Sequence, residues 1–313
     1  MSKDNREDNT LRIIFMGTPD FAVASLDAMV ADGWNVVAVV TAPDKPAGRG
    51  MKLTPSAVKQ YAIDKGIPVL QPVKLKDPEF LEALRGYQAD LQVVVAFRML
   101  PELVWNMPPL GTINLHGSIL PQYRGAAPIN WAIINGETET GVTTFRLKQE
   151  IDTGDILLKR TMPIHAEDDF KAVHDRMKSL GAAVLVETIR GLAAGTLTPI
   201  PQDHVDPQTL KPAPKIFTDH CRLHWDQPVA VLHNQVRGLS PVPGAFTTLN
   251  GKMLKIFRSK PIYARHGQAP GTVAMNGKHT LRFAAADGWL EVLELQAEGK
   301  KRMAVDDFLR GYR

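Results

Sequence analysis

Short apolar runs alternate with segments of helical periodicity through the first 116 residues, and this alternation constrains the fold more than any other feature. The apolar runs have the length and composition of buried strands and occupy residues 11–16, 36–40, 69–70, 91–95 and 112–116. Helical periodicity occupies the intervening residues 20–31, 56–65 and 78–85. Strands that alternate with helices join through right-handed crossovers into a parallel sheet that is buried on both faces. The sequence therefore predicts an α/β domain with a Rossmann-like, mostly parallel sheet and helices on both faces.

The chain changes character beyond a long predicted helix at residues 168–195. Residues 199–214 are rich in proline and lack periodicity, which is typical of a linker. Short segments of β propensity then alternate with Gly and Asn turns, at residues 245–249, 254–257 and 280–283. This pattern predicts a small OB-like β-barrel. For a chain of 313 residues we expect a disordered tail at 1–10, a first domain at 11–198, a linker at 199–214 and the β-barrel at 215–313.

The composition is that of an ordinary globular protein, with 44% hydrophobic residues. The sequence contains no run of about 18 apolar residues, so no membrane partner is expected. The N-terminal residues are polar and of mixed charge, unlike a signal or transit peptide. The single cysteine, Cys221, excludes an internal disulfide and a cysteine-cluster metal site. We expect a monomer in the cytoplasm.

The charge is distributed unevenly along the chain. Residues 207–313 hold 16 Lys and Arg against 8 Asp and Glu, a net charge of +8. Residues 1–206 carry a net charge of −4. A basic second domain beside an acidic first domain favours a polyanionic partner, although an uneven solubility surface would give the same pattern.

The turn after the first predicted strand lacks the glycines of nucleotide-binding loops. Residues 16–20 read Met-Gly-Thr-Pro-Asp, with one glycine where a dinucleotide fingerprint has three. Pro19 also removes a backbone N–H group from this turn. The phosphate-binding loop of ATP-dependent enzymes is absent as well. We therefore predict no nucleotide cofactor, which argues against a nicotinamide-dependent oxidoreductase.

Asn114, His116 and Asp152 are the most informative polar residues. Asn114 and His116 are two apart at the end of a predicted strand, so both side chains should point to one face of the sheet. In such sheets ligands bind beyond the carboxyl ends of the strands. An amide can donate a hydrogen bond to a developing oxyanion, an imidazole can hold or move a proton, and a carboxylate can orient the imidazole. Taken singly, each residue also has an ordinary explanation: a capping amide, a satisfied histidine and a turn aspartate.

The residues around this group resemble the folate-dependent formyltransferase family. Residues 114–121 read Asn-Leu-His-Gly-Ser-Ile-Leu-Pro, and residues 152–155 read Asp-Thr-Gly-Asp. Further segments resemble the family and follow one another along the chain in the family's order. They lie at residues 16–23, 43–50, 66–72, 123–128, 139–143 and 212–215. The resemblance covers the chain from about residue 11 to nearly its end. Residues 97–99 depart from the usual family pattern, and so does Glu150, where the family usually has Gly.

The resemblance implies a catalytic first domain that transfers the formyl group of 10-formyltetrahydrofolate, a co-substrate, to an amine without a metal or nucleotide. The tetrahedral carbon formed in this reaction carries an oxyanion, which an amide and an imidazolium can stabilise. The implied catalytic residues are Asn114, His116 and Asp152. The implied folate-binding turn consists of Ser118, Ile119, Leu120 and Pro121.

The resemblance is closest to the branch of the family that formylates the α-amino group of charged methionyl-initiator tRNA. In that branch the long loop at residues 43–55 enters the acceptor stem, and the cations of this loop are Lys45, Arg49 and Lys52. Glycines beside fixed cations suit a loop that orders against phosphates and an unpaired base. The basic β-barrel would bind the rest of the acceptor arm.

Other functions remain open at this point. The same chemistry could act on a small amine, such as an amino sugar or a purine precursor, or water could replace the amine and give a formyl-folate hydrolase. An RNA-binding protein with an inactive enzyme domain is a further alternative. The loop at residues 43–55 and the basic second domain argue against a small acceptor, and the presence of Asn114, His116 and Asp152 argues against an inactive domain.

Overall fold

The computed structural model describes residues 10–47, 52–202, 206–277 and 279–311. The chain divides into two compact units. The first comprises residues up to Arg124 together with Gly141–Thr161 and Asp175–Leu210, and the second comprises Gly125–Thr140, Met162–His174 and the residues from Lys211 onwards. Of the predicted N-terminal tail, residues 1–9 lie outside the described residues.

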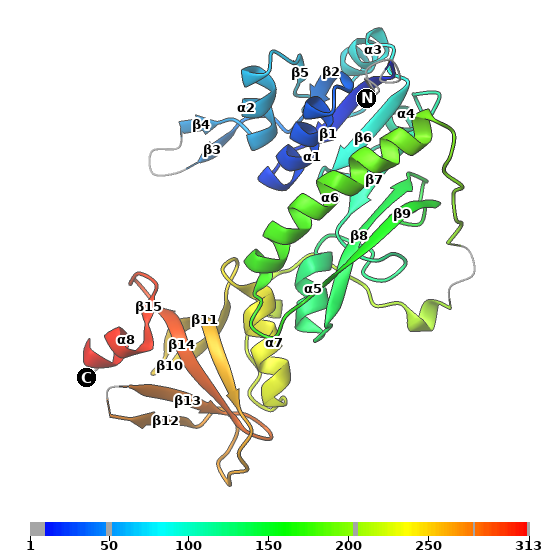
Figure 1. Ribbon diagram of the computed structural model, residues 1–313. Coiled ribbons are helices and arrows are strands. Elements are labelled where there is room, and N and C mark those ends of the chain that lie inside the picture. Colours follow the sequence, from blue (N-terminus) through cyan, green and yellow to red (C-terminus); the bar gives the residue numbers. More distant parts are fainter. Residues whose placement is uncertain (1–9, 48–51, 203–205, 278, 312–313) are drawn as a thin grey trace, which may run out of the picture. The chain divides into compact units, whose positions relative to one another are not determined.

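One mostly parallel sheet organises the first unit (Figure 1). Its strand order is β5-β2-β1-β6-β7-β8-β9. The strands are β1 (Arg12–Gly17), β2 (Asn35–Val40), β5 (Val69–Leu70), β6 (Leu91–Val95), β7 (Thr112–His116), β8 (Glu139–Arg146) and β9 (Ile156–Pro163). The pairs β1–β2, β2–β5, β1–β6 and β6–β7 are parallel, whereas β7–β8 is antiparallel. The order reverses at β1, so the carboxyl ends of β1, β6 and β7 form the edge where ligands of such sheets bind.

Helices pack against both faces of this sheet, as the sequence pattern predicts. They are α1 (Asp20–Ala31), α2 (Ala57–Asp64), α3 (Pro78–Gly86), α4 (Glu102–Trp105) and α6 (Phe170–Ala193). On one face, Ile14 and Met16 of β1 share an apolar cluster with Leu84 of α3 and Val104 of α4. On the other face, α6 approaches so closely that a Cβ built at Gly181 would lie 2.9 Å from the Leu115 side chain. Among the described helices, none combines the length and apolar character needed to cross a bilayer.

The segment predicted to be a long loop at residues 43–55 contains two short strands. β3 (Lys45–Ala47) and β4 (Lys52–Thr54) pair antiparallel, with Lys45 opposite Thr54. At the base of this hairpin, Lys59 of α2 donates a hydrogen bond to Asp44 at 2.7 Å. Lys59 and Gln71 together lower the pKa of the Asp44 carboxyl. The two arms of this loop are therefore paired as a hairpin, which the sequence pattern did not indicate.

The second unit is built on an antiparallel sheet of order β10-β11-β14-β13-β12, with β15 paired to β14. Its strands are β10 (Ala245–Leu249), β11 (Lys252–Ile262), β12 (Val273–Asn276), β13 (Thr280–Ala284), β14 (Trp289–Ala297) and β15 (Met303–Ala304). Its helices are α5 (Pro128–Ile134), α7 (Val229–Leu239) and α8 (Val305–Gly311), and 3-10 turns occupy Pro207–Thr209 at the end of the first unit and Thr218–Cys221 in the second. Leu232 and Val236 of α7 pack with Ile256, Leu290 and Val292 of the sheet in one buried core. The predicted fold class was a Rossmann-like, mostly parallel sheet followed by a small OB-like β-barrel. The structure confirms the Rossmann-like sheet and a second domain built on an antiparallel sheet.

Candidate active site

The end of β7 carries Asn114 and His116 on one face of the sheet. In the antiparallel pair with β8, Asn114 lies opposite Phe145 and His116 lies opposite Thr143. Residues directly opposite each other in such a pair point to the same side, which places these four side chains together. The half-buried Asn114 amide makes no side-chain hydrogen bond within the described ranges. It is therefore available to donate to a ligand oxygen.

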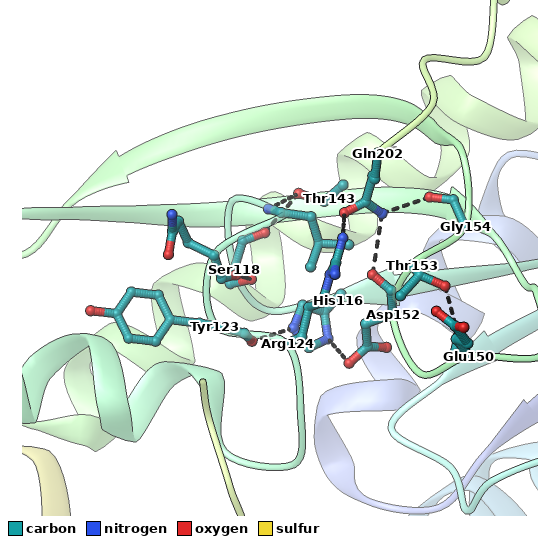
Figure 2. Close-up of polar contacts among 12 residues, drawn as sticks. His116, Ser118, Tyr123, Arg124, Thr143, Glu150, Asp152, Thr153, Gly154 and Gln202 are labelled. Carbon is teal, nitrogen blue, oxygen red and sulfur yellow. Dashed lines mark hydrogen bonds and ion pairs between the residues drawn. The ribbon is translucent and has the colours of Figure 1, made fainter. Parts of the chain in front are cut away.

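His116 is buried and lies between two oxygen atoms (Figure 2). Its Nε2 lies 2.8 Å from the carbonyl oxygen of Tyr123. Because a carbonyl only accepts hydrogen bonds, Nε2 carries a proton. Its Nδ1 lies 3.8 Å from Oδ2 of Asp152, which is within ion-pair range but beyond a direct hydrogen bond. Nδ1 is thus the nitrogen that can gain or lose a proton.

The loop at residues 152–155 brings Asp152 to His116. Asp152 is 9% exposed and adopts a left-handed backbone conformation with φ of 55°, which Asp tolerates better than most residues. A Cβ built at Gly154 would lie 1.6 Å from the carbonyl oxygen of Arg146, so only glycine fits this close approach to β8. The backbone N–H of Arg146 donates to the carbonyl of Asp155 at 3.0 Å. The Asp-Thr-Gly-Asp sequence therefore has a structural reason as well as a chemical one.

The turn predicted to bind folate is held by the Ser118 side chain and by Thr143 of β8. Ser118 is fully buried, and its hydroxyl donates to the carbonyl of Gln122 at 2.6 Å. Thr143 donates to the carbonyl of Ser118 at 2.7 Å and accepts from the backbone N–H of Leu120 at 3.0 Å. Leu120 is also fully buried, whereas Ile119 and Pro121 are half-buried. The Ser118 and Leu120 side chains therefore stabilise the turn, and a ligand would meet its backbone and the other two residues.

Lys159 of β9 also supports this turn, a role that its sequence context did not indicate. Its Nζ donates to the carbonyl of Leu120 at 2.6 Å. Burial lowers the pKa of the Lys159 amine. A lone lysine in a strand is indistinguishable from a surface residue until the sheet is assembled.

Gln202 and Arg124 are two further site residues that sequence reasoning missed. Gln202 is 7% exposed and lies in the segment predicted to be a linker. Its Nε2 donates to the carbonyl oxygens of Gly154 at 2.6 Å and Asp152 at 3.2 Å, and its Oε1 accepts from Nη2 of Arg124 at 2.8 Å (Figure 2). Because the segment is rich in proline and lacks periodicity, its sequence predicted a linker and no buried glutamine.

The residues that depart from the family pattern have defined contacts. Arg98 donates to the carbonyl oxygen of Val73 at 2.8 Å and also to that of Pro72, so it joins the loop after β5 to the loop after β6. Burial lowers the pKa of the Arg98 guanidinium. Glu150 is exposed, and its carbonyl accepts from the Thr153 hydroxyl at 3.1 Å. The Arg98 side chain therefore joins two loops at this edge of the sheet, whereas the contact at Glu150 uses a backbone carbonyl that a glycine would also supply.

The predicted tRNA-binding residues are only partly described. Lys45 is exposed on β3. Arg49 lies outside the described residues, as does the side chain of Lys52. Across the described ranges, no group of three or more His, Cys, Asp or Glu side chains is arranged to hold a metal ion.

Comparison with known proteins gives matches over nearly the whole chain. Residues 11–189 match the family model Formyl transferase, and residues 215–313 match Formyl transferase, C-terminal domain. The methionyl-tRNA formyltransferase of Bacteroides fragilis is 54% identical over 308 residues, covering 96% of this chain and 95% of that protein.

Two solved structures share the fold at low sequence identity. HypX from Aquifex aeolicus, in complex with tetrahydrofolic acid, matches with a TM-score of 0.64 at 20% identity. This match covers 96% of the chain and 47% of HypX, so the chain spans about half the length of that protein. An N-formyltransferase from Helicobacter canadensis, in complex with folinic acid and dTDP-3-aminofucose, matches with a TM-score of 0.67 at 18% identity, covering 92% of the chain and 100% of that structure.

Proposed function

The chain belongs to the formyl transferase family, and from this premise we propose that it transfers the formyl group of 10-formyltetrahydrofolate to the α-amino group of methionyl-initiator tRNA. The observation that carries the proposal is the 54% identity to a methionyl-tRNA formyltransferase over 96% of the chain. The pairing of His116 with Asp152 at the carboxyl edge of the sheet supports it independently.

The reaction exchanges one C–N bond for another. The α-amino nitrogen attacks the formyl carbon and forms a new C–N bond, while the bond from that carbon to N10 of the folate breaks. The amine loses one proton and N10 gains one, so the products are the formylated amine and tetrahydrofolate. An α-amino group has an unperturbed pKa of about 7.7–8.0, so much of it is already neutral and nucleophilic near pH 7.5.

The three polar residues have distinct roles in this proposal. The Asn114 amide donates to the oxyanion of the tetrahedral intermediate, where a preorganised donor contributes most. The Nδ1–H of protonated His116 is the second donor, because Nε2 is already engaged by Tyr123. Asp152 stabilises the imidazolium and accepts, through a water molecule, the proton lost by the amine.

The co-substrate would bind at the carboxyl ends of β6 and β7. Ala96, directly after β6, has a left-handed backbone with φ of 49°, a conformation that is uncommon for residues with a side chain and that clusters at functional sites. Backbone groups here and in the turn formed by Ser118, Ile119, Leu120 and Pro121 can read the polar edge of a pterin ring. Fixed backbone donors and acceptors suit a flat heterocycle that presents both.

Charged tRNA would be bound through cations in each unit. In the first unit these are Lys45, Arg49 and Lys52, all within residues 43–55 of the sequence. In the second unit, β11 exposes Lys252, Arg258 and Lys260. Arg258 and Lys260 form no ion pair within the described residues, so they remain available to phosphates. On this proposal residues 11–198 are the catalytic domain, 199–214 the linker and 215–313 the tRNA-binding domain.

Steady-state release of tetrahydrofolate tests the proposal. The protein is supplied with 10-formyltetrahydrofolate and, in parallel, methionyl-initiator tRNA, free methionine, uncharged initiator tRNA or an amino sugar. We expect turnover with the charged tRNA alone. Turnover with an amino sugar alone, or in the absence of any acceptor, would contradict the assignment and indicate a small-molecule formyltransferase or a hydrolase.

We further propose that the enzyme acts as a monomer in the cytoplasm. Light scattering of the purified protein tests whether it is a monomer.

A further inference from the structure

We propose that Gln202 is a positioning residue for Asp152: its side chain fixes the backbone of the loop at residues 152–155 and thereby sets the separation between Asp152 and His116. The inference deepens the proposed function and rests on it, because it concerns the same catalytic residues. It assigns an active-site role to a segment whose sequence predicts only a linker.

One amide group of Gln202 makes three hydrogen bonds. Its Nε2 donates to the carbonyls of Asp152 and Gly154, at 3.2 and 2.6 Å, which lie on either side of Thr153. Its Oε1 accepts from Nη2 of Arg124 at 2.8 Å. A single side chain therefore holds both ends of the bend that presents the Asp152 carboxylate.

These contacts complete a closed ring of interactions around His116 (Figure 2). Nε2 of His116 contacts the carbonyl of Tyr123, whose neighbour Arg124 donates to Gln202. Gln202 donates to the backbone of Asp152, whose carboxylate returns to Nδ1 of His116. Gln202 is thus the link between the two groups that hold opposite sides of the imidazole ring.

The backbone on either side of this arrangement is fixed as well. Ile200 and Ile156 exchange two backbone hydrogen bonds, each of 2.8 Å, which pin the segment carrying Gln202 to the start of β9. Gln202 itself is buried, so its amide reaches the loop from an anchored and desolvated position. Buried hydrogen bonds of this kind are costly to leave unmade.

The loop needs this support because of its conformation. Asp152 has φ of 55°, a sparsely populated region that persists only where the surroundings over-determine it. The separation of 3.8 Å between Asp152 and His116 is also at the limit of an ion pair, so a small outward displacement would end it. Loss of the Gln202 side chain should therefore lower kcat and leave the affinity for both substrates unchanged.

Gln202→Leu tests the inference, with Gln235→Leu as a matched control. Gln235 also donates from one Nε2 to two backbone carbonyls, those of His220 at 2.8 Å and Arg222 at 3.0 Å, but it lies in the second unit. We expect Gln202→Leu to lower kcat by roughly 10- to 100-fold, because a misplacement of about 1 Å can cost two orders of magnitude. The KM values for both substrates should stay within about twofold of those of the wild type. Gln235→Leu should lose a similar amount of Tm and retain its kcat.

A second variant separates the donor from the bulk of the side chain. Gln202→Glu keeps the shape and the pairing with Arg124 but replaces the N–H donor by a carboxylate oxygen. It should lose as much kcat as Gln202→Leu. Wild-type kcat in both Gln202 variants, or an equal loss in Gln235→Leu, would overturn the inference.

A double-mutant comparison shows whether Gln202 acts through Asp152. In the Asp152→Asn background, Gln202→Leu should lower kcat by less than about twofold, because the group it positions is already disabled. A full additional 10-fold loss would mean that Gln202 acts elsewhere.

Hydrogen exchange tests the positioning without any substrate. Backbone amides of the peptide spanning residues 150–157 should exchange at least about 10-fold faster in Gln202→Leu than in the wild type. Unchanged exchange would overturn the inference even in an active enzyme. If the wild type itself formylates no methionyl-tRNA, the proposed function fails while this measurement still decides the role of Gln202.

Discussion

At the scale of single residues, the site combines a polar trio with the groups that hold it. His116 Nε2 is committed to the carbonyl of Tyr123, so its chemistry takes place at Nδ1, on the side of Asp152. Asp152 reaches that position through a left-handed backbone and a glycine two residues later, whose absent side chain lets the loop contact Arg146. The catalytic carboxylate of Asp152 and the glycine that permits the turn, Gly154, thus belong to the same four-residue motif.

Asp152→Asn preserves the shape of this arrangement and removes its charge. We expect kcat to fall by roughly 100- to 10,000-fold, because the imidazolium loses its partner and the attacking amine loses its proton acceptor. Affinity for methionyl-tRNA, measured by filter binding, should remain within about twofold of the wild type. Near-full turnover would show that the trio has been assigned incorrectly.

At the scale of helices and strands, local pattern was sufficient for most of the first unit. Apolar runs bounded by turns predicted β1, β2, β6 and β7, and the period-2 spacing in β7 correctly predicted that Asn114 and His116 share a face. Contacts between residues far apart in the sequence could not be predicted from local pattern. Gln202 lies 50 residues along the chain from Asp152 and 78 from Arg124, and no periodicity relates such positions.

The hairpin of β3 and β4 was missed for a different reason. Its arms are three residues each, too short to show an alternating pattern, and one of them contains Pro46. Its base is fixed by the contacts that Asp44 makes with Lys59 and Gln71. Because the sequence here is rich in Pro and Gly, it did not indicate a hairpin, although hydrogen bonds of Asp44 hold the base of this hairpin in place.

This hairpin should matter for tRNA and not for the chemical step. We expect Arg49→Ala to lower kcat/KM for methionyl-tRNA by roughly 10-fold or more, since one charge-assisted contact to a phosphate or base is worth about 1–3 kcal/mol. The KM for 10-formyltetrahydrofolate should not change. Lys76→Ala removes an exposed cation from the loop between β5 and α3 and serves as the control. Equal kinetic constants for the two variants would show that Arg49 does not contribute to tRNA recognition.

Helix α7 carries a buried histidine that makes the second unit sensitive to acid. Burial, and secondarily the charge of Arg237, lower the pKa of His233 from 6.5 to about 4. Between these values the unfolded chain binds a proton that the folded chain does not, so stability is present above pH 6.5 and is lost as the pH falls towards 4. The loss attributable to His233 is about 3 kcal/mol.

Urea unfolding at pH 7 and pH 4.5 measures this effect. His233→Asn stays neutral at both pH values, so its free energy of unfolding should fall less than that of the wild type. Equal falls in the two proteins would show that His233 is not the sensitive group.

At the scale of the whole molecule, charge divides the chain into an acidic first part and a basic second part. Composition alone left open whether this asymmetry serves a polyanion or only solubility. The structure adds that Arg258 and Lys260 are exposed on β11 and form no ion pair within the described residues. By contrast, Arg282 and Arg302 are paired with Glu291 and Glu294. The unpaired cations are the ones expected to bind phosphate.

Replacing Arg258 and Lys260 by Ala should weaken binding of methionyl-tRNA and make it less dependent on salt. Each lost phosphate contact should lower the slope of log K against log salt by about 1. The value of kcat at saturating tRNA should stay within about twofold of the wild type. The double variant of the paired residues, Arg282→Ala with Arg302→Ala, should change the slope less. An unchanged slope in Arg258→Ala with Lys260→Ala would show that β11 does not contact the tRNA.

In the proposed reaction the formyl group ends on the amino group of methionine attached to initiator tRNA. Its most direct test uses 10-formyltetrahydrofolate labelled in the formyl carbon, with charged initiator tRNA, free methionine and an amino sugar together in one reaction. After base hydrolysis of the aminoacyl ester, chromatography locates the label. We expect the label in N-formylmethionine released from the tRNA, and Asp152→Asn should abolish most of it. Label in the amino sugar or in free formate would contradict the proposed function.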